Sequence, residues 1–169
     1  INISASIPTT DRIKETLFNM LAPELEGAYF LDLFAGSGQI GLEAVSRGSA
    51  YCVFVDNNKK ACEVIQDNID FTKFTSSCDL KCMDALSALR MLERRYVFDI
   101  IFMDPPYKQE LEYDVLSYLK DSSLLKENGI IIVEASLDTA FDYLPDMGFT
   151  LKRLKTYKTN EHAFIIKNQ

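Results

Sequence analysis

The sequence contains no tryptophan and a single histidine, and its four cysteines never stand in a C-x-x-C pair. The cysteines are Cys52, Cys62, Cys78 and Cys82, and His162 lies far from all of them along the chain. Structural zinc sites and redox-active dithiols need closely spaced cysteine or histidine ligands. We therefore expect no metal site and four reduced, mostly buried thiols.

Long hydrophobic runs are also missing. No apolar stretch approaches the roughly 20 residues that a membrane-spanning helix needs. The first residues, INISASIPTT, have neither the basic nor the apolar region of a secretory signal peptide. We expect a cytoplasmic protein with no membrane partner.

The chain has no excess of positive charge, and its formal net charge at pH 7 is -7. A protein that binds nucleic acid over a broad surface needs a basic face to neutralise phosphates. Any nucleic-acid contact of this chain must therefore be confined to a small basic region. Three basic clusters are candidates: Arg12 with Lys14; Arg90 with Arg94 and Arg95; and Lys152, Arg153, Lys155 and Lys158. We expect the second to be a solvated face, and the third is equally compatible with a solvated face or a contact surface.

The composition is that of one globular domain. The 169 residues, 47% hydrophobic and 25% charged, suffice for one core but not for separate cofactor and substrate domains. We expect a single domain over 1–169, with an N-terminal helix and lead-in over 1–27 and a sheet core over 28–169. One domain must then hold every ligand.

Strand-like and helix-like apolar patterns alternate along the chain. The predicted strands cover 29–34, 51–55, 79–83, 98–103, 129–135, 149–155 and 163–167. The predicted helices cover 10–21, 39–47, 59–71, 85–92, 111–120 and 137–144. Thr9 or Thr10 is expected to cap the first helix, and Pro23 with Gly27 to separate it from the first strand.

Five βα units followed by two strands with no helix between them predict an α/β fold. We expect a doubly wound, mostly parallel seven-stranded sheet that ends in a C-terminal antiparallel hairpin. Ligands of such sheets bind outside the carboxyl ends of the strands, where the strand order switches. The predicted site therefore comprises Asp32 to Gly38, Asp56, Asp84 and Asp104 to Tyr107.

A literal G-x-G-x-x-G runs from Gly36 to Gly41, and Asp56 ends the next predicted strand. Glycines let a backbone approach a nucleotide-like cofactor, and the acidic residue accepts hydrogen bonds from ribose hydroxyls. Asp32, just before the loop, suits the cationic methionine end of S-adenosylmethionine, whereas it would repel a pyrophosphate. Asp84 is expected either to contact the cofactor's adenine or only to cap the next helix. The predicted S-adenosylmethionine-binding residues are Asp32, Phe34, Ala35, Gly36, Ser37, Gly38, Asp56, Asn57, Asp84 and Ala85.

Asp104-Pro105-Pro106-Tyr107 follows the fourth predicted strand and is the more specific signal. An amine on an aromatic ring is a poor nucleophile because its lone pair is delocalised. If the Asp104 carboxylate and the Pro105 carbonyl accept its N–H groups, the lone pair can point at a methyl donor. Pro106 stiffens the turn, and Tyr107 offers a face on which an extruded base can stack. These four are the predicted catalytic residues. His162 has no evident partner, so we expect it to be structural or exposed.

Three segments taken together resemble the RsmD family of bacterial 16S ribosomal RNA guanine-N2 methyltransferases. They are PTTDRIKETLFN at 8–19, DLFAGSG at 32–38 and DPPY at 104–107. The resemblance implies a Rossmann-like class I methyltransferase fold, S-adenosylmethionine as methyl donor and a guanine 2-amino group as acceptor. The implied partner is 16S rRNA, in an assembled or assembling small ribosomal subunit.

The resemblance also assigns roles to residues. It implies that Asp32, Gly36 and Gly38 line the cofactor's methionine end, Asp56 its ribose and Asp84 its adenine, while Asp104, Pro105 and Tyr107 hold the target base. Thr10, Arg12 and Lys108 are the further candidates for contact with the substrate.

Other functions fit parts of the pattern. The Asp104 motif suits any planar amine, including an adenine 6-amino group or a protein side-chain amide. The glycine loop alone would suit a nicotinamide-dependent oxidoreductase, although the chain has no room for a substrate domain. A non-catalytic RNA-binding assembly factor could keep the same fold.

Overall fold

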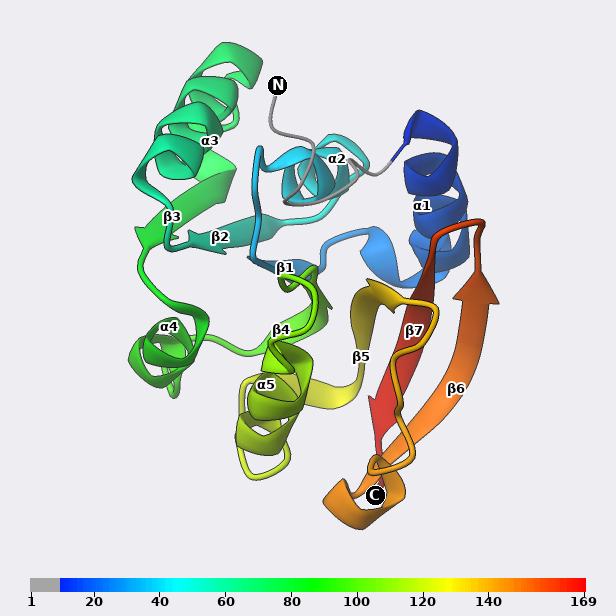
Figure 1. The fold of residues 1–169 in the computed structure, drawn as a ribbon. Coiled ribbons are helices and arrows are strands. Elements are labelled where there is room, and N and C mark those ends of the chain that lie inside the picture. Colours follow the sequence, from blue (N-terminus) through cyan, green and yellow to red (C-terminus); the bar gives the residue numbers. More distant parts are fainter. Residues whose placement is uncertain (1–9) are drawn as a thin grey trace.

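Seven strands form one sheet in the computed structural model, which describes residues 10–169, and the strand order is β3-β2-β1-β4-β5-β7-β6 (Figure 1). The strands are β1 (Tyr29–Leu33), β2 (Tyr51–Asp56), β3 (Cys78–Cys82), β4 (Phe98–Met103), β5 (Leu125–Ser136), β6 (Phe149–Thr156) and β7 (Asn160–Lys167). The helices are α1 (Asp11–Leu25), α2 (Gln39–Ser46), α3 (Lys59–Thr72), α4 (Ala85–Leu92) and α5 (Leu111–Leu119), with short 3-10 turns η1 (Thr75–Ser77) and η2 (Pro145–Met147). Pro8 and Thr9 of the predicted N-terminal motif lie outside the described residues.

Strand β1 lies next to the central strand β4, where the strand order switches. It pairs in parallel with β2 on one side and with β4 on the other; Leu31, for example, pairs with Val53 and with Ile101. Strand β5 extends the parallel part, and β7 then pairs antiparallel with both β5 and β6. The predicted doubly wound sheet with an antiparallel C-terminal hairpin is confirmed.

Helices cover both faces of the sheet (Figure 1). On one face α1, α2 and α3 enclose a core that contains Phe18, Phe30 and Phe54. On the other face α4 and α5 enclose a second core around Leu89 and Leu116. Because both faces are buried, the inner parallel strands are mostly apolar. Charged residues stand at both ends of the strands: Asp99 lies near the start of β4, and Asp32 and Asp56 lie near the carboxyl ends of β1 and β2.

The first helix runs past Pro23, contrary to the prediction. Thr10 caps α1 as expected, its hydroxyl accepting the Ile13 N–H at 3.2 Å. The helix continues to Leu25 because Leu21 and Leu25 are both buried and extend its apolar stripe by one turn. This packing outweighs the hydrogen bond that Pro23 cannot donate.

The helix predicted over 137–144 does not form, and that prediction is wrong. The segment is a series of turns held by local bonds, with the Ser136 hydroxyl bonded to Asp138 and to Thr139. Its apolar residues have helical spacing, but only Phe141 and Leu144 are buried, whereas Leu137 is 47% exposed. Serine and aspartate side chains that bond nearby groups compete with helix formation, and here they prevail.

The cysteines are free and differ in burial. Cys52 and Cys62 are buried, Cys78 is partly buried and Cys82 is exposed, so the expectation of mostly buried thiols holds for half of them. Among residues 10–169, no helix is long and apolar enough to cross a membrane.

Candidate functional site

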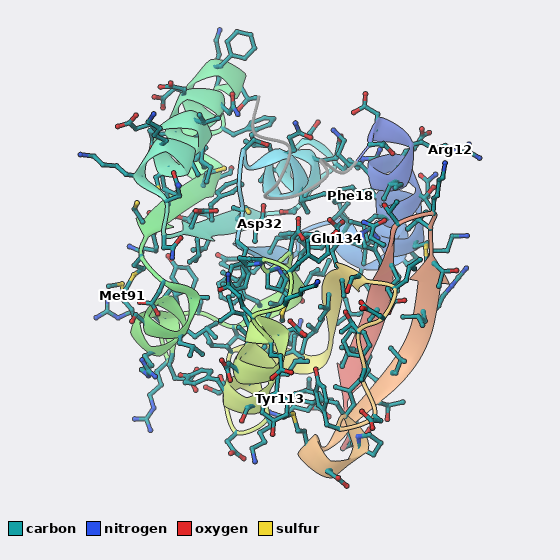
Figure 2. The ribbon with its side chains drawn as sticks, viewed as in Figure 1. Arg12, Phe18, Asp32, Met91, Tyr113 and Glu134 are labelled. Atoms are coloured by element: carbon teal, nitrogen blue, oxygen red, sulfur yellow. The ribbon has the colours of Figure 1, made fainter. Side chains whose placement is uncertain are left out.

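Acidic side chains gather where the parallel strands end. Asp32 and Asp56 are among the last residues of β1 and β2. Asp84 and Asp104 follow β3 and β4, and Glu134 lies near the end of β5. Figure 2 shows Asp32 and Glu134 close to the middle of the molecule, at this edge of the sheet. Four of the five were predicted from sequence; Glu134 was not.

The loop between β1 and α2 is a tight turn made by left-handed residues. Phe34, Gly36 and Gly38 have φ values of 59°, 61° and 82°. The Ala35 N–H donates to the Val55 carbonyl at 3.0 Å, which ties the loop to β2. Gly38 caps α2 in the left-handed conformation, which explains the glycine there. The predicted cofactor loop is therefore a compact backbone surface beside the end of β2.

Asp56 organises this loop through both of its carboxylate oxygens. Oδ2 accepts the Gly36 N–H at 2.9 Å, and Oδ1 accepts the Asn58 N–H at 2.9 Å. Asn68 of α3 donates to the Ser37 carbonyl at 3.0 Å. A carboxylate has about four lone-pair positions, so Asp56 can still accept hydroxyl donors. Asn57 is exposed beside it.

Asp32 is buried, with 1% of its surface exposed. Its Oδ2 accepts the Gly41 N–H at 3.0 Å, in the first turn of α2. Burial raises the pKa of Asp32 well above its ordinary value, the Gly41 bond opposes this, and the charges of Asp56 and Glu134 add to the rise. A cation placed here would relieve the repulsion between these carboxylates.

Gly41 lets α2 approach β2 closely. A Cβ at this position would lie 2.6 Å from the Cys52 sulfur and 2.8 Å from Cζ of Phe54. Gly41→Ala is expected to lower the free energy of unfolding by about 3 kcal/mol, as overpacking of a rigid core does. Urea unfolding followed by circular dichroism measures this. The control is Gly27→Ala, where a Cβ meets nothing within 4 Å and only the positive φ is strained; equal losses in the two variants would contradict the packing argument.

Asp84 caps α4. Its Oδ2 accepts the Ser87 N–H at 3.0 Å, and these bonds lower the pKa of Asp84. The side chain is exposed, and Ala85 begins the helix beside it. The capping role is present, and a contact with adenine remains a prediction.

The Asp104–Tyr107 turn leaves β4 next to the glycine loop. The Asp104 N–H donates to the Leu33 carbonyl at 3.3 Å, so the turn is fixed against the end of β1. Asp104 is partly buried, Pro105 is buried, and Pro106 and Tyr107 are exposed. Sequence reasoning thus identified two segments that the fold brings together.

The electrostatics of this turn are set by Glu134. Burial, the charge of Glu134 and a hydrogen bond with the Glu134 side chain raise the pKa of Asp104 to about 9, and Asp32 contributes further. Burial and the charges of Asp104 and Glu134 also raise the pKa of Tyr107. Asp104 and Glu134 therefore share a proton at neutral pH.

Two buried polar residues complete the site and were missed from sequence. Nε2 of His162 lies 2.7 Å from Oε1 of Glu134, and the exposed fractions of the two residues are 0% and 4%. His162 is structural in position, as expected, but it has a partner. Glu134 could have been suspected, because a glutamate inside the apolar run 129–135 must have a polar partner when buried.

A cavity of about 690 Å³ lies between the segment that follows the Asp104 turn and the turns after β5. Its lining includes Lys108, Tyr113, Ser136 and Tyr143, and the rings of Tyr113 and Tyr143 meet edge to face with centroids 4.9 Å apart. Lys108, a predicted substrate contact, has the left-handed φ of 62° in the turn that leads to α5. The cavity is large enough for a nucleotide.

Thr10 and Arg12, the other predicted substrate contacts, lie apart from these carboxylates. Both are exposed at the start of α1. Figure 2 places Arg12 on the outer end of α1, beside the β6–β7 hairpin and away from Asp32. They can contact only a substrate that extends well beyond the site.

Comparisons with known proteins identify relatives of this chain. A family model described as "Conserved hypothetical protein 95" matches residues 1–166. The chain is 41% identical over 128 residues to "Putative rRNA methyltransferase YlbH" of Bacillus subtilis, covering 75% of this chain and 70% of that one. It is 34% identical over 139 residues to "Ribosomal RNA small subunit methyltransferase D" of Haemophilus influenzae, covering 82% and 72%. The structure of a putative methyltransferase, yhhF, from Escherichia coli superposes with a TM-score of 0.83 at 30% identity, covering 96% and 88%.

Proposed function

The chain belongs to the RsmD/YlbH family of class I S-adenosylmethionine-dependent methyltransferases, and from this membership we propose that it methylates the 2-amino group of a guanine in 16S rRNA. The observation that carries the proposal is the set of buried carboxylates between the glycine loop and the Asp104 turn. The negative charges of Asp56 and Glu134 repel an ionised Asp32 and raise its pKa, in addition to the larger effect of burial. A cationic methyl donor would relieve this repulsion, and a dinucleotide pyrophosphate would increase it. The site thus favours methyl transfer over nicotinamide chemistry.

The residues present fit S-adenosylmethionine. Asp32 and the loop of Phe34, Ala35, Gly36, Ser37 and Gly38 would receive the methionine end, with backbone close to the ligand. Asp56 and Asn57 would receive the ribose, and Asp84 with Ala85 the adenine. When bound, the cofactor supplies a methyl group on a positively charged sulfur.

The Asp104 turn would hold the acceptor amine. An oxygen of Asp104 and the Pro105 carbonyl accept its two N–H groups, so the nitrogen lone pair faces the methyl donor above the glycine loop. Pro106 restricts the turn, and Tyr107, with 40% of its surface exposed, is free to stack on an extruded base.

Removal of the Tyr107 ring tests the stacking role. Tyr107→Ala is expected to raise the KM for RNA about tenfold, because base stacking on an aromatic ring contributes about 1–3 kcal/mol. Tyr107→Phe keeps the ring and is the matched control, with a KM near that of the wild type. Steady-state methyl transfer over a range of RNA concentrations measures both. Similar KM values for Tyr107→Ala and Tyr107→Phe would show that no base stacks here.

The acceptor is inferred from the relatives. Their names specify ribosomal RNA, and one specifies the small subunit. An adenine amine or a protein amide would fit the same turn, so the 2-amino group of guanine rests on the family. With a net charge of -7, RNA contacts must be local, and Arg12, Thr10 and Lys108 are the proposed ones. A ribosomal substrate would place the enzyme in the cytoplasm, acting on assembled or assembling small subunits.

The decisive experiment supplies radiolabelled S-adenosylmethionine and small-subunit particles from cells that lack this enzyme. Free 16S rRNA, DNA and protein are offered in parallel, and digested product is resolved to the nucleoside. Label in N2-methylguanosine supports the proposal. Label in N6-methyladenosine or a protein amide would keep the chemistry and replace the acceptor. RNA binding without any transfer, although the donor binds, would indicate an assembly factor instead.

A further inference from the structure

A hydrogen-bonded chain leads from the partly buried Asp104 of the proposed reaction centre to two buried side chains, Glu134 and His162. Asp104 follows β4, Glu134 lies in β5 and His162 in β7, and Glu134 faces His162 directly in the antiparallel register. Nε2 of His162 is 2.7 Å from Oε1 of Glu134, and the Glu134 side chain is also hydrogen-bonded to Asp104. The sheet itself therefore connects the amine-binding turn to a histidine in the core.

The protons in this chain can be assigned from its surroundings. Nδ1 of His162 is buried and has no hydrogen-bond partner among the residues that the structure describes. An unpaired N–H there would cost more than an unpaired acceptor, so the ring proton lies on Nε2, which donates to Glu134. Two carboxyl groups can be hydrogen-bonded to each other only through a proton, so one proton lies between Glu134 and Asp104. Glu134 then accepts from His162 on one side and shares this proton on the other.

We propose that Glu134 is the final acceptor of the proton that the target amine loses on methylation, that Asp104 relays this proton, and that His162 is the positioning residue that keeps Glu134 oriented. The inference rests on the proposed function, since it concerns the same reaction centre. Nothing in the methyltransferase motifs assigns a role to either Glu134 or His162.

The atoms and electrons balance along this path. The amine lone pair forms the new N–C bond, and the C–S bond breaks with its electron pair left on sulfur. The methylated nitrogen, now positive, gives an N–H proton to the free oxygen of Asp104, while the proton of Asp104 moves to Glu134. Glu134 ends as a neutral acid and returns its proton to water when the products leave.

The charges of the site favour this transfer. Among the described residues, the titratable groups near Glu134 include the acids Asp32, Asp104, Tyr107 and Tyr157 and the imidazole of His162. Before the reaction the positive donor offsets the negative Glu134; afterwards both are neutral. The proton thus replaces the lost cation, and the net charge of the site is the same before and after the transfer.

Two rings hold His162 in place. Phe102 and Tyr157 meet the imidazole edge to face, with centroids 6.0 Å and 5.5 Å away. The histidine is fully buried, so it cannot exchange its proton directly with water. This arrangement suits a fixed donor to Glu134 and does not suit a group that touches the substrate.

Glu134→Gln tests the proposal in two independent ways. In the free protein labelled with ¹³C at aspartate carboxyls, Asp104 should lose its proton at a pH about one unit or more below the wild-type value, because the charge of Glu134 is gone. With saturating RNA and donor, the single-turnover rate should fall about 100-fold, the usual size of a lost proton acceptor, while the affinity for RNA stays within threefold. The rate should also lose its wild-type pH profile.

A pair of histidine variants separates position from mere packing. His162→Gln keeps a nitrogen donor near Oε1 of Glu134, whereas His162→Phe fills the space without one. The proposal expects near-normal rates for His162→Gln and a loss of about tenfold for His162→Phe, with both folded by circular dichroism. This pair decides the matter even if Glu134→Gln does not fold.

The outcomes distinguish this proposal from the proposed function. A wild-type rate and an unchanged Asp104 titration in Glu134→Gln, or equal rates for the two histidine variants, would overturn it. If the wild-type protein methylates no acceptor, the proposed function fails, and the Asp104 titration in the free protein still shows whether Glu134 shares its proton.

Discussion

Asp104→Ala is expected to slow methyl transfer by about 10²–10³-fold at saturating substrate, the loss typical of removing one preorganised hydrogen-bonding group from a reaction centre. The side chain is fixed by its backbone bond to Leu33 and by its bond to Glu134, so no neighbouring group can take its place. Single-turnover transfer of radiolabelled methyl measures the rate. Donor affinity, measured by calorimetry, should change less than threefold, because the methionine end is assigned to Asp32 and the glycine loop.

The control is Asp121→Ala, which removes a carboxylate with 83% of its side chain exposed, just beyond α5. A rate equal to that of the wild type is expected for it. A rate for Asp104→Ala within threefold of this control would remove Asp104 from the mechanism. Asp104→Asn adds a finer comparison: it keeps an oxygen toward the amine and a hydrogen toward Glu134, but it cannot pass on a proton. The relay therefore expects Asp104→Asn to be slow as well.

The parts of the fold that local chemistry determines were predictable from sequence. Continuous apolar strands, glycines at the left-handed positions 36 and 38, and acidic residues at strand ends all act within a few residues. Together they predicted the strand order switch and the meeting of Asp32, Asp56 and Asp104. The doubly wound pattern then left little freedom, because parallel strands bring their carboxyl ends to one edge of the sheet.

The failures arose where distant packing or side-chain competition decides. The segment 137–144 has helical apolar spacing but forms turns. The Ser136 hydroxyl bonds to side chains nearby, and Leu137 is exposed, so a helix would gain little buried surface there. Pro23 did not end α1, because Leu25, two residues later, packs in the core and stabilises another turn of helix. The pairing of Glu134 with His162 depends on the register of β5 against β7, which sequence spacing does not reveal.

The stability of the free protein is expected to fall as pH rises from about 5 to 8. Burial and Glu134 raise the pKa of Asp104 to about 9, and burial also raises that of Asp32, whereas both titrate near their ordinary values when unfolded. Below pH 4 both states hold these protons, and the contribution of these two carboxyls to stability is greatest. Above it the unfolded chain releases them first, so unfolding becomes easier by up to about 1.4 kcal/mol per pH unit for each retained proton.

Urea unfolding at half-unit pH steps measures this slope, and Asp104→Asn isolates the share of one carboxyl. In Asp104→Asn the free energy of unfolding should fall less steeply with pH than in the wild type, by up to about 1.4 kcal/mol per pH unit. Asp121→Asn should keep the wild-type slope. A slope that is the same in all three proteins would show that Asp104 is ionised in the folded state. A cationic donor reverses the trend, because it binds best to ionised Asp32; its affinity should therefore rise over the same pH range in which the free protein weakens. The ionised buried carboxylates thus lower the stability of the free protein and raise its affinity for a positively charged ligand.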